Sequence, residues 1–552
     1  MIKFLWSAIF VLILTSAAHA TVFEVGSGKQ YSKISDVVTL VQPGDRVDIY
    51  PGVYTEVMRW QVPGTAMNPI VVRGVGATKP VLDAHGLNVD GTLPNPRAIM
   101  QFEGDYYIVE NLEFKNARNV NGNGAGIRIR GAYNVTVRLC HIHNCDMGMM
   151  SDSMNDLLVE HCEVNDNGDG TGYAHNFYLS GTNATVRFCE IYNANGGQNF
   201  KCRLHYVELL YNYIHDADSK EIDIVDSQYN TTIPNSNALV VGNLVIKKQA
   251  ALNTGQYLIF GQDLGNDRIG TLYCYYNTFI ATDQKNKFIW INNSQSKGIF
   301  VGNIFYGSNS MIYDANTDAR ILTGSRNNWI PTTASAPTNF AASVKGTLPD
   351  FVDSVANNYH LNQTSSCVDA GIPFSNISYV DGDGNSHTLD VFWEYYHKTQ
   401  KVARFKDLMP DIGAFEYGTG SILIQIDPAV LFNGKVNEPY TQTVSASGGT
   451  QPYQYFVSQG TLPTGLTIDS TTGEISGTPQ ESGFFNITIQ VIDRNYVIGE
   501  RQYTLRVGGT GSGCSMSTLP DNSVPILSIV LIALIVIFRR FVILKRNIVK
   551  TL

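Results

Sequence analysis

The feature that most constrains the fold is a short motif that recurs along the middle of the chain. Each copy places a polar or small residue, Asn or Cys, just ahead of an apolar position, and successive copies lie about 22 to 34 residues apart. The nine copies are VENLEF, RLCHIH, EHCEVN, RFCEIY, LYNYIH, VGNLVI, YYNTFI, VGNIFY and RNNWIP. When aligned, they give a single column of Asn111, Cys140, Cys162, Cys189, Asn212, Asn243, Asn277, Asn303 and Asn328.

This repeat predicts an all-β solenoid, a parallel β-helix, because no helical periodicity competes with it. In such a fold each coil contributes short strands, and like residues stack on like about 4.8 Å apart. A stacked Asn can pass an amide hydrogen bond to the next coil where the backbone bends. We expect the cysteines of the column to be buried as small apolar residues. A disulfide framework is not expected, because stacked side chains point in parallel, which suits a bridge poorly.

Longer segments extend this prediction through a resemblance. Together with the Asn column, residues 42–56 (QPGDRVDIYPGVYTE), 68–86 (NPIVVRGVGATKPVLDAHG) and 410–417 (PDIGAFEY) resemble the right-handed parallel β-helix, pectin-lyase-like superfamily. The resemblance implies a right-handed β-helix over residues 21–417, with an extended polysaccharide bound on an outer face. It implies no single activity, because this fold hosts many, and the complete motif sets of pectate lyases, polygalacturonases and mannuronan epimerases are not found.

Residues 421–507 have a different pattern and predict a second domain. Short alternating strands are separated by Gly/Pro turns, as in TLPTGLTIDSTTGEISGTPQESGFFNITIQVID. This run resembles the immunoglobulin-like (Ig-like) or dystroglycan-cadherin-like modules of bacterial surface proteins, and a β-sandwich of this length fits. We expect the module to act in spacing or binding, because it carries no candidate catalytic residue.

The first 20 residues predict a signal peptide. Lys3 supplies a positive start, an apolar run follows, and Ala18-His19-Ala20 is a small-x-small cleavage site. The mature chain is therefore expected to be secreted across the inner membrane, with its bulk outside the cytoplasm.

The other end predicts an anchor. A flexible Gly/Ser-rich linker (508–523) precedes an apolar segment (524–544) that is long enough for a transmembrane or sorting helix, and a basic tail (545–552) follows. Positive charges belong inside, so the domains before the anchor are expected outside, attached to the membrane or cell surface. The arrangement resembles bacterial sorting signals, with Cys514 as a point of processing or lipidation; an ordinary tail anchor is the alternative.

The composition narrows the range of partners. The formal net charge is −9, and charged residues make up only 16% of the chain, which argues against a nucleic-acid partner. An acidic polysaccharide is not attracted by this overall charge either, so such a substrate needs a local cationic site. We expect the protein to be a monomer.

Four strand-like segments hold most of the candidate chemistry: GIRIR (126–130), NFYLS (176–180), NFKCR (199–203) and EIDIV (221–225). Period-two alternation points the apolar residues of each segment inward. The remaining positions predict three outward columns on successive coils, namely Tyr178, Lys201 and Asp223; Asn176, Asn199 and Glu221; and Ser180, Arg203 and Val225. One edge of the coils is expected to carry His175, Gln198 and Lys220.

These columns predict a lyase that cleaves a uronate-containing glycan by β-elimination. The reaction needs the sugar carboxylate neutralised, a base for the neighbouring C–H proton, and help for the departing O4 oxygen. Arg203 suits bidentate contact with a carboxylate, and Lys201, Tyr178 and His175 are candidates for base or acid. Asp223 beside Lys201 favours the charged ammonium, which opposes a role as base.

Three alternatives stay open for the same cluster. A glycoside hydrolase would use Glu221 and Asp223 as its two carboxylates. A non-enzymatic adhesin or glycan-binding surface protein would use the coils and the Ig-like module for reach and display. The charges can also form plain cross-strand pairs, worth under about 1 kcal/mol each.

Calcium is the one cofactor that the sequence suggests. Five carboxylates offer the oxygen ligands that Ca²⁺ prefers, namely Asp216, Asp218, Glu221, Asp223 and Asp226. NDNGDGTG (165–172) and DGDGNSH (381–387) resemble calcium-loop spacing but fit polar turns between coils better. His141, His143 and His161 flank the motif column, where histidines are more often hydrogen-bonded than bound to metal.

Overall fold

The computed structural model describes residues 20–508 except 77, 93–94, 248–255, 284–286, 392, 397–399, 405–408, 418–423, 449–450 and 493–497. The predicted transmembrane helix and basic tail, and all of the signal peptide but Ala20, lie outside the described residues. Within that described part of the chain, no helix is long and apolar enough to cross a membrane.

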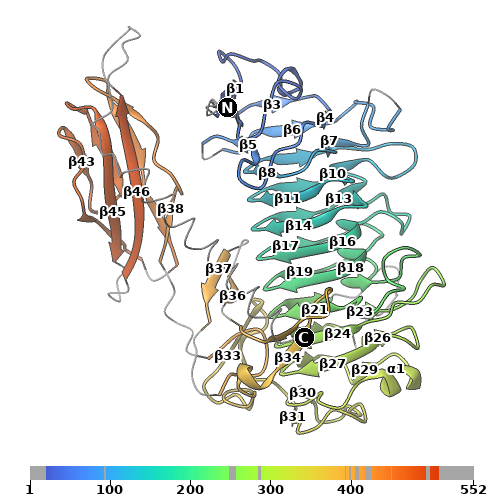
Figure 1. The fold of residues 1–552 in the computed structure, drawn as a ribbon. Helices are drawn as coiled ribbons and strands as arrows, with labels where there is room; N and C mark the ends of the chain where they lie inside the picture. Colours follow the sequence, from blue (N-terminus) through green and yellow to red (C-terminus); the bar gives the residue numbers. More distant parts are fainter. Residues whose placement is uncertain are drawn as a thin grey trace, which may run out of the picture. The chain divides into compact units, whose positions relative to one another are not determined.

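Most of the described chain is a stack of parallel strands arranged in three rows (Figure 1). The first row consists of β4 (Met58–Trp60), β7 (Ala98–Phe102), β10 (Ala125–Arg130), β13 (Met147–Asp152), β16 (Phe177–Arg187), β18 (Phe200–Leu210), β20 (Ile222–Ile224), β23 (Gln256–Phe260), β26 (Lys287–Ile291) and β29 (Ser310–Ile312). The second row consists of β1 (Val22–Val25), β2 (Arg46–Ile49), β5 (Ile70–Gly74), β8 (Tyr107–Glu110), β11 (Tyr133–Arg138), β14 (Asn155–Glu160), the second halves of β16 and β18, β21 (Ala238–Val241), β24 (Thr271–Tyr275) and β27 (Lys297–Val301). The third row consists of β3 (Val53–Tyr54), β6 (Val81–Asp83), β9 (Glu113–Lys115), β12 (His141–His143), β15 (Glu163–Asn165), β17 (Glu190–Tyr192), β19 (Tyr213–His215), β22 (Leu244–Lys247), β25 (Thr278–Ala281), β28 (Ile304–Tyr306), β30 (Trp329–Pro331) and β31 (Val344–Gly346).

Strands β16 and β18 are each 11 residues long and join the first row to the second. They pair in parallel from Phe177 with Phe200 to Arg187 with Leu210. Gly181 lies at the bend of β16 with a φ of +147°, and a Cβ there would come within 2.0 Å of the Met154 carbonyl oxygen. Glycine is therefore required at this bend, because any side chain would collide with the coil before it.

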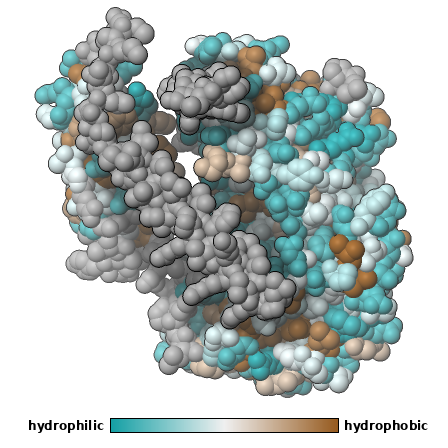
Figure 2. Space-filling model, in the orientation of Figure 1, coloured by the Kyte–Doolittle hydropathy of each residue, from teal (hydrophilic) through white to brown (hydrophobic). Residues whose placement is uncertain are grey.

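The interior of the stack is apolar because inward residues alternate along each strand. Phe177, Phe200 and Ile222 follow one another on successive coils and are fully buried, and the rings of Phe177 and Phe200 lie 5.6 Å apart. Each such side chain contributes about 1.5–3 kcal/mol through burial. Figure 2 shows that the visible surface of the coils is mainly hydrophilic, with small apolar patches.

The predicted asparagine ladder is present over five coils. The Nδ2 atom of each member donates to Oδ1 of the next at 2.9–3.0 Å, and the members are Asn212, Asn243, Asn277, Asn303 and Asn328. Upstream, the column continues through Cys140, Cys162 and Cys189, which are buried and free, as expected.

The prediction that Asn111 is the first member of the column is wrong. His141 pairs with Glu113, so Leu112 and not Asn111 is aligned with Cys140. Asn111 has a positive φ of 56°, and its Nδ2 atom donates to the Gly74 carbonyl oxygen at 3.0 Å. It caps a bend one position ahead of the ladder.

Parallel pairing ends at β31, and antiparallel hairpins follow within the region predicted as β-helix. They are β32 (Phe351–Asp353) with β33 (Asn358–Leu361), β34 (Ser378–Val380) with β35 (Ser386–Thr388), and β36 (Trp393–Tyr396) with β37 (Gln400–Ala403). The helical elements of the described chain are short, namely η1 (Ile34–Asp36), α1 (Ala315–Arg320) and η2 (Phe374–Asn376).

The C-terminal unit is a separate β-sandwich, and the prediction of an all-β protein with an Ig-like module is confirmed. One sheet has the order β39-β46-β45-β42, the other β40-β44-β43, and β38 pairs with β41. Its fully buried core includes Ile475, Ile489 and Leu505. The strands are β38 (Gln425–Asp427), β39 (Gly434–Lys435), β40 (Tyr440–Thr443), β41 (Ser445–Ser447), β42 (Gln454–Gln459), β43 (Leu466–Ile468), β44 (Glu474–Gly477), β45 (Gly483–Ile492) and β46 (Ile498–Gly508).

Candidate active site

The charged residues of the predicted columns lie on three neighbouring strands of the first row. Strand β18 pairs with β16 and β20, so that Lys201 lies between Tyr178 and Asp223 in one column. Arg203 lies beside Ser180 in the next column. Period-two alternation therefore gives the correct register for these strands.

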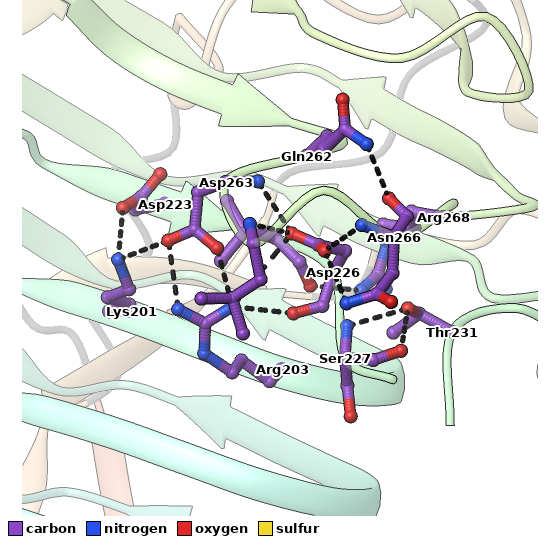
Figure 3. A network of polar contacts seen from close by, with 12 residues as sticks. Lys201, Arg203, Asp223, Asp226, Ser227, Thr231, Gln262, Asp263, Asn266 and Arg268 are labelled. Atoms are coloured by element: carbon purple, nitrogen blue, oxygen red, sulfur yellow. Dashed lines mark hydrogen bonds and ion pairs between the residues drawn. The ribbon is translucent and has the colours of Figure 1, made fainter. Parts of the chain in front are cut away.

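The ammonium of Lys201 lies between two carboxylates (Figure 3). Its Nζ atom is 2.7 Å from Asp263 Oδ2 and 3.2 Å from Asp223 Oδ2, and 12% of the side chain is exposed. Burial by itself would lower the pKa of Lys201, but the charges of Asp223 and Asp263 outweigh burial and raise it. Lys201 is thus held as an ammonium, which suits an acid or an electrostatic role and opposes the role of a base.

The guanidinium of Arg203 is already engaged on two sides. Its Nη1 and Nη2 atoms donate to the two oxygens of Asp263 at 2.5 and 2.9 Å, a bidentate pair. Nη1 also donates to the Asp226 carbonyl oxygen at 2.6 Å, and Nε donates to the Tyr178 hydroxyl oxygen at 3.0 Å. The two terminal nitrogens that were expected to hold a substrate carboxylate therefore hold Asp263, whereas Nε contacts the Tyr178 oxygen.

Sequence reasoning misses Asp263, the residue that joins the two cations. It follows β23 and lies 60 positions beyond Arg203 in the chain, in an irregular loop without periodicity. Burial raises the pKa of Asp263, but the hydrogen bond from Arg203 and the charge of Lys201 lower it further, to about 2. Asp263 is therefore ionised at neutral pH.

The loop that carries Asp263 is held in place by Asp226. The Asp226 carboxylate accepts hydrogen bonds from the backbone N–H groups of Asp263, Leu264 and Asn266 at 2.5, 2.9 and 2.8 Å (Figure 3). Asp226 is fully buried, so this anchor replaces the water that the turn would otherwise require. Its role is to position Asp263.

His175 lies on the edge of the cluster as a neutral ring. Its Nδ1 atom accepts a hydrogen bond from the Gln198 backbone N–H at 3.1 Å, which leaves the proton on Nε2. Burial, assisted by the charges of Lys201 and Lys220, lowers the pKa of His175 to about 3. With Nδ1 occupied, His175 can donate through Nε2 but is a poor base. Its ring meets the Tyr178 ring edge-on, 5.4 Å between centroids.

The prediction that Glu221 points outward is wrong. Glu221 directly precedes the strand that starts at Ile222, and it is fully buried at the corner of the coil. It ends a second ladder: Asn176 Nδ2 donates to Asn199 Oδ1 at 2.8 Å, and Asn199 Nδ2 donates to Glu221 Oε2 at 2.6 Å. The buried Lys247 ammonium lies 3.5 Å from Glu221 Oε1. Asn176 and Asn199 are likewise buried, so this column is internal.

Asp223 lies in the predicted column, next to Lys201, but the prediction that it is exposed is wrong. Asp223 is fully buried beneath the ammonium groups of Lys201 and Lys220, at 3.2 and 3.5 Å. Neither carboxylate oxygen of Asp223 has a hydrogen-bond partner. Because both Glu221 and Asp223 are buried and paired with lysines, the structure does not present them as the two carboxylates of a hydrolase.

The predicted calcium ligands do not form one group. The Lys201 ammonium lies between Asp223 and Asp263, where a cation bridging these carboxylates would lie. Asp226 is used by the backbone N–H groups of the 263–266 turn. These residues therefore fit Ca²⁺ poorly.

A groove of about 490 Å³ lies over the second row, between β14, β16, β18 and the β34–β35 hairpin. At its wall, Glu208 accepts hydrogen bonds from the Tyr206 hydroxyl and the Thr185 hydroxyl, both at 3.0 Å. Asp381 and His387 contribute from the hairpin. The sequence pattern does not reveal this groove, because one of its walls is a hairpin about 170 residues downstream of β18.

Comparisons with solved structures find similar chains at low sequence identity. Pectate lyase Pel9A is 15% identical, with 72% of this chain and 97% of that chain covered and a TM-score of 0.48. XylC in complex with xylose is 9% identical, with 72% and 98% covered and a TM-score of 0.44. An alginate lyase from Paenibacillus sp. str. FPU-7 is 13% identical, with 53% and 96% covered and a TM-score of 0.37. At these identities the likeness concerns the fold and not the activity.

Family models identify both parts of the chain. Residues 85–238 match the model described as "Right handed beta helix region", and residues 423–508 match the model described as "Putative Ig domain". No curated protein matches the chain. The chain thus combines a right-handed β-helix region with a C-terminal Ig-like domain.

Proposed function

We propose that this protein acts on an extracellular acidic polysaccharide and cleaves it by β-elimination at the Tyr178–Lys201 column. One observation carries the proposal: a phenol oxygen in contact with a guanidinium lies one coil away from a fixed ammonium. These groups place, side by side, a phenol oxygen as candidate base and a positive charge for a uronate. In a chain of net charge −9, such a local group of cations is what an acidic polymer needs.

The roles follow from the contacts. Tyr178 is the candidate base: after its hydroxyl proton has passed to solvent, its oxygen, which Arg203 Nε contacts at 3.0 Å, takes the C5 proton of the uronate. The electron pair of that C–H bond forms the C4–C5 double bond, the C4–O4 bond breaks, and O4 takes a proton. The Lys201 ammonium faces the uronate carboxylate and offsets the charge that develops beside it. The Nε2–H of His175, at the Tyr178 ring, is the candidate donor to O4.

Asp263 competes with the substrate for the two cations. Its carboxylate occupies the bidentate fork of Arg203 and one side of Lys201, as a substrate carboxylate would. Asp263 is 27% exposed, so an incoming uronate meets it at the surface and competes for the same cations. Binding of the polymer therefore weakens with added salt, since the attraction is electrostatic.

The test uses the full chain with uronate polymers, following the ultraviolet absorbance of the unsaturated product. Tyr178→Phe removes only the phenol oxygen, and a loss of about 10²-fold or more in rate is expected. Lys201→Ala is expected to lose activity as well. Lys287→Ala, on β26 of the same row, is the matched control and keeps the rate. A rate unchanged in Tyr178→Phe and Lys201→Ala contradicts the assignment.

A binding protein without catalysis is the second candidate, and a specific observation favours it: both cations already have carboxylate partners. The Ig-like domain suits display at the cell surface. Binding on a glycan array without product formation would support this adhesin-like function. New reducing ends without an unsaturated product would instead support a hydrolase, whose carboxylates would have to be residues other than Glu221 and Asp223.

The proposed cellular setting rests on the two chain ends. Secretion and anchoring follow from residues 1–20 and 524–544, and they stay predictions, as does the monomeric state. Fractionation of the producing cells, with protease accessibility of the Ig-like domain, checks them.

A further inference from the structure

The His-x-His segment of β12 meets Glu113 of the neighbouring strand on the outside of the third row. Glu113 of β9 pairs with His141 of β12, and His143 follows two positions on, so the three side chains project from the same face. The two imidazole rings are stacked with centroids 4.2 Å apart. Glu113 and His143 are 24% and 18% exposed, which leaves the group open to small solutes.

The hydrogen bonds leave one unprotonated nitrogen on each ring. Asn165 donates through its Nδ2 to Asp166, so its Oδ1 is directed to His141 Nε2 at 2.8 Å and accepts the proton carried there. Likewise His143 Nδ1 lies 2.7 Å from the amide oxygen of Asn144. In the neutral rings, these contacts place the lone pairs on His141 Nδ1 and His143 Nε2.

This is the arrangement that surrounds metal-binding histidines, in which the second ring nitrogen is held by an oxygen acceptor. His143 Nε2 also lies 3.2 Å from Glu113 Oε1, so the ring nitrogen and the carboxylate already face one another, and a cation between them would contact both.

We propose that Glu113, His141 and His143 form a binding site for a divalent transition metal of the Zn²⁺ or Cu²⁺ class. One ligand atom from each residue lies within 4.8 Å of the others. Metal–ligand bonds of about 2.0–2.1 Å require ligand atoms roughly 3.4 Å apart. Side-chain rotations that move the ligand atoms by about 1 Å bring them to this separation. Two imidazoles and one carboxylate favour these ions over Ca²⁺, which takes oxygen ligands.

The neighbouring cation does not block the site. Lys115 Nζ is 3.8 Å from Glu113 Oε1, but it is also 4.0 Å from Asp83 Oδ2. Lys115 can therefore stay with Asp83 when Glu113 turns to a metal. The site is independent of the proposed lyase chemistry, because it lies on the third row, whereas Tyr178 and Lys201 lie on the first.

The experiment is a calorimetric titration of the untagged full chain with ZnCl₂, after removal of metals with a chelator. One equivalent is expected to bind. His141→Ala and His143→Ala are each expected to weaken binding at least tenfold, and Glu113→Gln less. His215→Ala is the matched control: it lies in the same row beside Glu190 at 3.4 Å, but without a second histidine, and it should leave Zn²⁺ affinity unchanged.

A spectroscopic readout separates metal binding from loss of structure. Co²⁺ in place of Zn²⁺ is expected to give visible absorption bands of a four-coordinate site, which disappear in His143→Ala while the unfolding midpoint is kept. Absence of saturable binding, or equal Zn²⁺ affinity in the wild type and the His141→Ala/His143→Ala double variant, overturns the proposal. In that case Glu113 and His143 form only an ion pair, and His141 only stacks on His143.

Discussion

Glu221 and Asp223 are two positions apart in the chain, and each pairs with a lysine, yet they lie in different surroundings. Glu221 is at the interior corner of the coil, where it ends an amide ladder and meets the buried Lys247. Asp223 is on the outer side of the sheet but fully buried, beneath the ammonium groups of Lys201 and Lys220. The difference shows that strand boundaries, more than spacing, decide where a charge goes.

The two pairs also differ in how far their polar groups are satisfied. The Glu221 carboxylate accepts hydrogen bonds from Asn199 and from the Ala217 backbone N–H, at 2.6 and 3.1 Å. Asp223 has no hydrogen-bond partner for either oxygen. A fully satisfied buried pair is part of the scaffold, whereas the buried Asp223 carboxylate is held by ion pairs alone. Predictions that separate these two roles follow, from the largest expected effect to the smallest.

Removing the interior cation should have the largest effect on stability. Lys247→Met leaves the Glu221 carboxylate buried without its partner, which costs about 3–5 kcal/mol in unfolding free energy. Urea unfolding measures the loss. The double variant Lys247→Met/Glu221→Gln should recover much of it, because a neutral amide still accepts from Asn199. No recovery in the double variant would mean that the charge is not the cause.

The asparagine ladder tests what a buried hydrogen bond between neutral groups contributes to stability. Asn277→Ala removes the acceptor of Asn243 Nδ2 and of the Asn243 backbone N–H, at 2.9 Å each, and both are buried. The expected loss is about 3 kcal/mol, since unsatisfied buried donors carry their full desolvation cost. Urea unfolding is again the measurement. A loss below about 1 kcal/mol would show that the ladder adds little to the apolar core.

The stability contributed by the outer cluster should depend on pH through Asp263. The pKa of Asp263 is about 2, against an ordinary value of 3.8, so its ionised form stabilises the fold by about 2 kcal/mol at neutral pH. This contribution is present above pH 3.8 and is lost as pH falls towards 2. Asp263→Asn should therefore be about 2 kcal/mol less stable than wild type at pH 7, and the gap should close between pH 4 and 2. A gap independent of pH contradicts the ion pairing.

The smallest loss in unfolding free energy is expected from a more exposed ion pair on the coils. Arg187 Nη2 lies 2.7 Å from Glu160 Oε2 on adjacent strands, and 37% of the arginine side chain is exposed. Arg187→Gln should cost less than about 1 kcal/mol, because such pairs gain little in water. Urea unfolding with and without added salt checks this. A loss as large as that of Lys247→Met would remove the distinction between interior and outer pairs.

The sequence predicts the fold well and the cluster in part, for physical reasons. Alternation along strands gives the register that brings Lys201 and Arg203 together, because inward positions must be apolar. It misplaces Glu221, since a residue at a corner obeys hydrogen-bond geometry and not alternation. It misses Asp263, whose loop has no repeat. It places Asn111 one position off, because Leu112 occupies the ladder position there without changing the apolar pattern.

The asparagine ladder has a direction: from Asn212 to Asn303, each Nδ2 atom donates to Oδ1 of the next member toward the C-terminal end, and Asn328 accepts the last of these bonds. Any further coil with Asn at this position could be inserted between two members, and the chain of amides would simply be one link longer. Upstream the column holds Cys, whose Sγ atoms donate to backbone carbonyl groups and so pass nothing on from side chain to side chain. The C-terminal half of the solenoid is therefore built to lengthen by whole-coil duplication, and the N-terminal half is not.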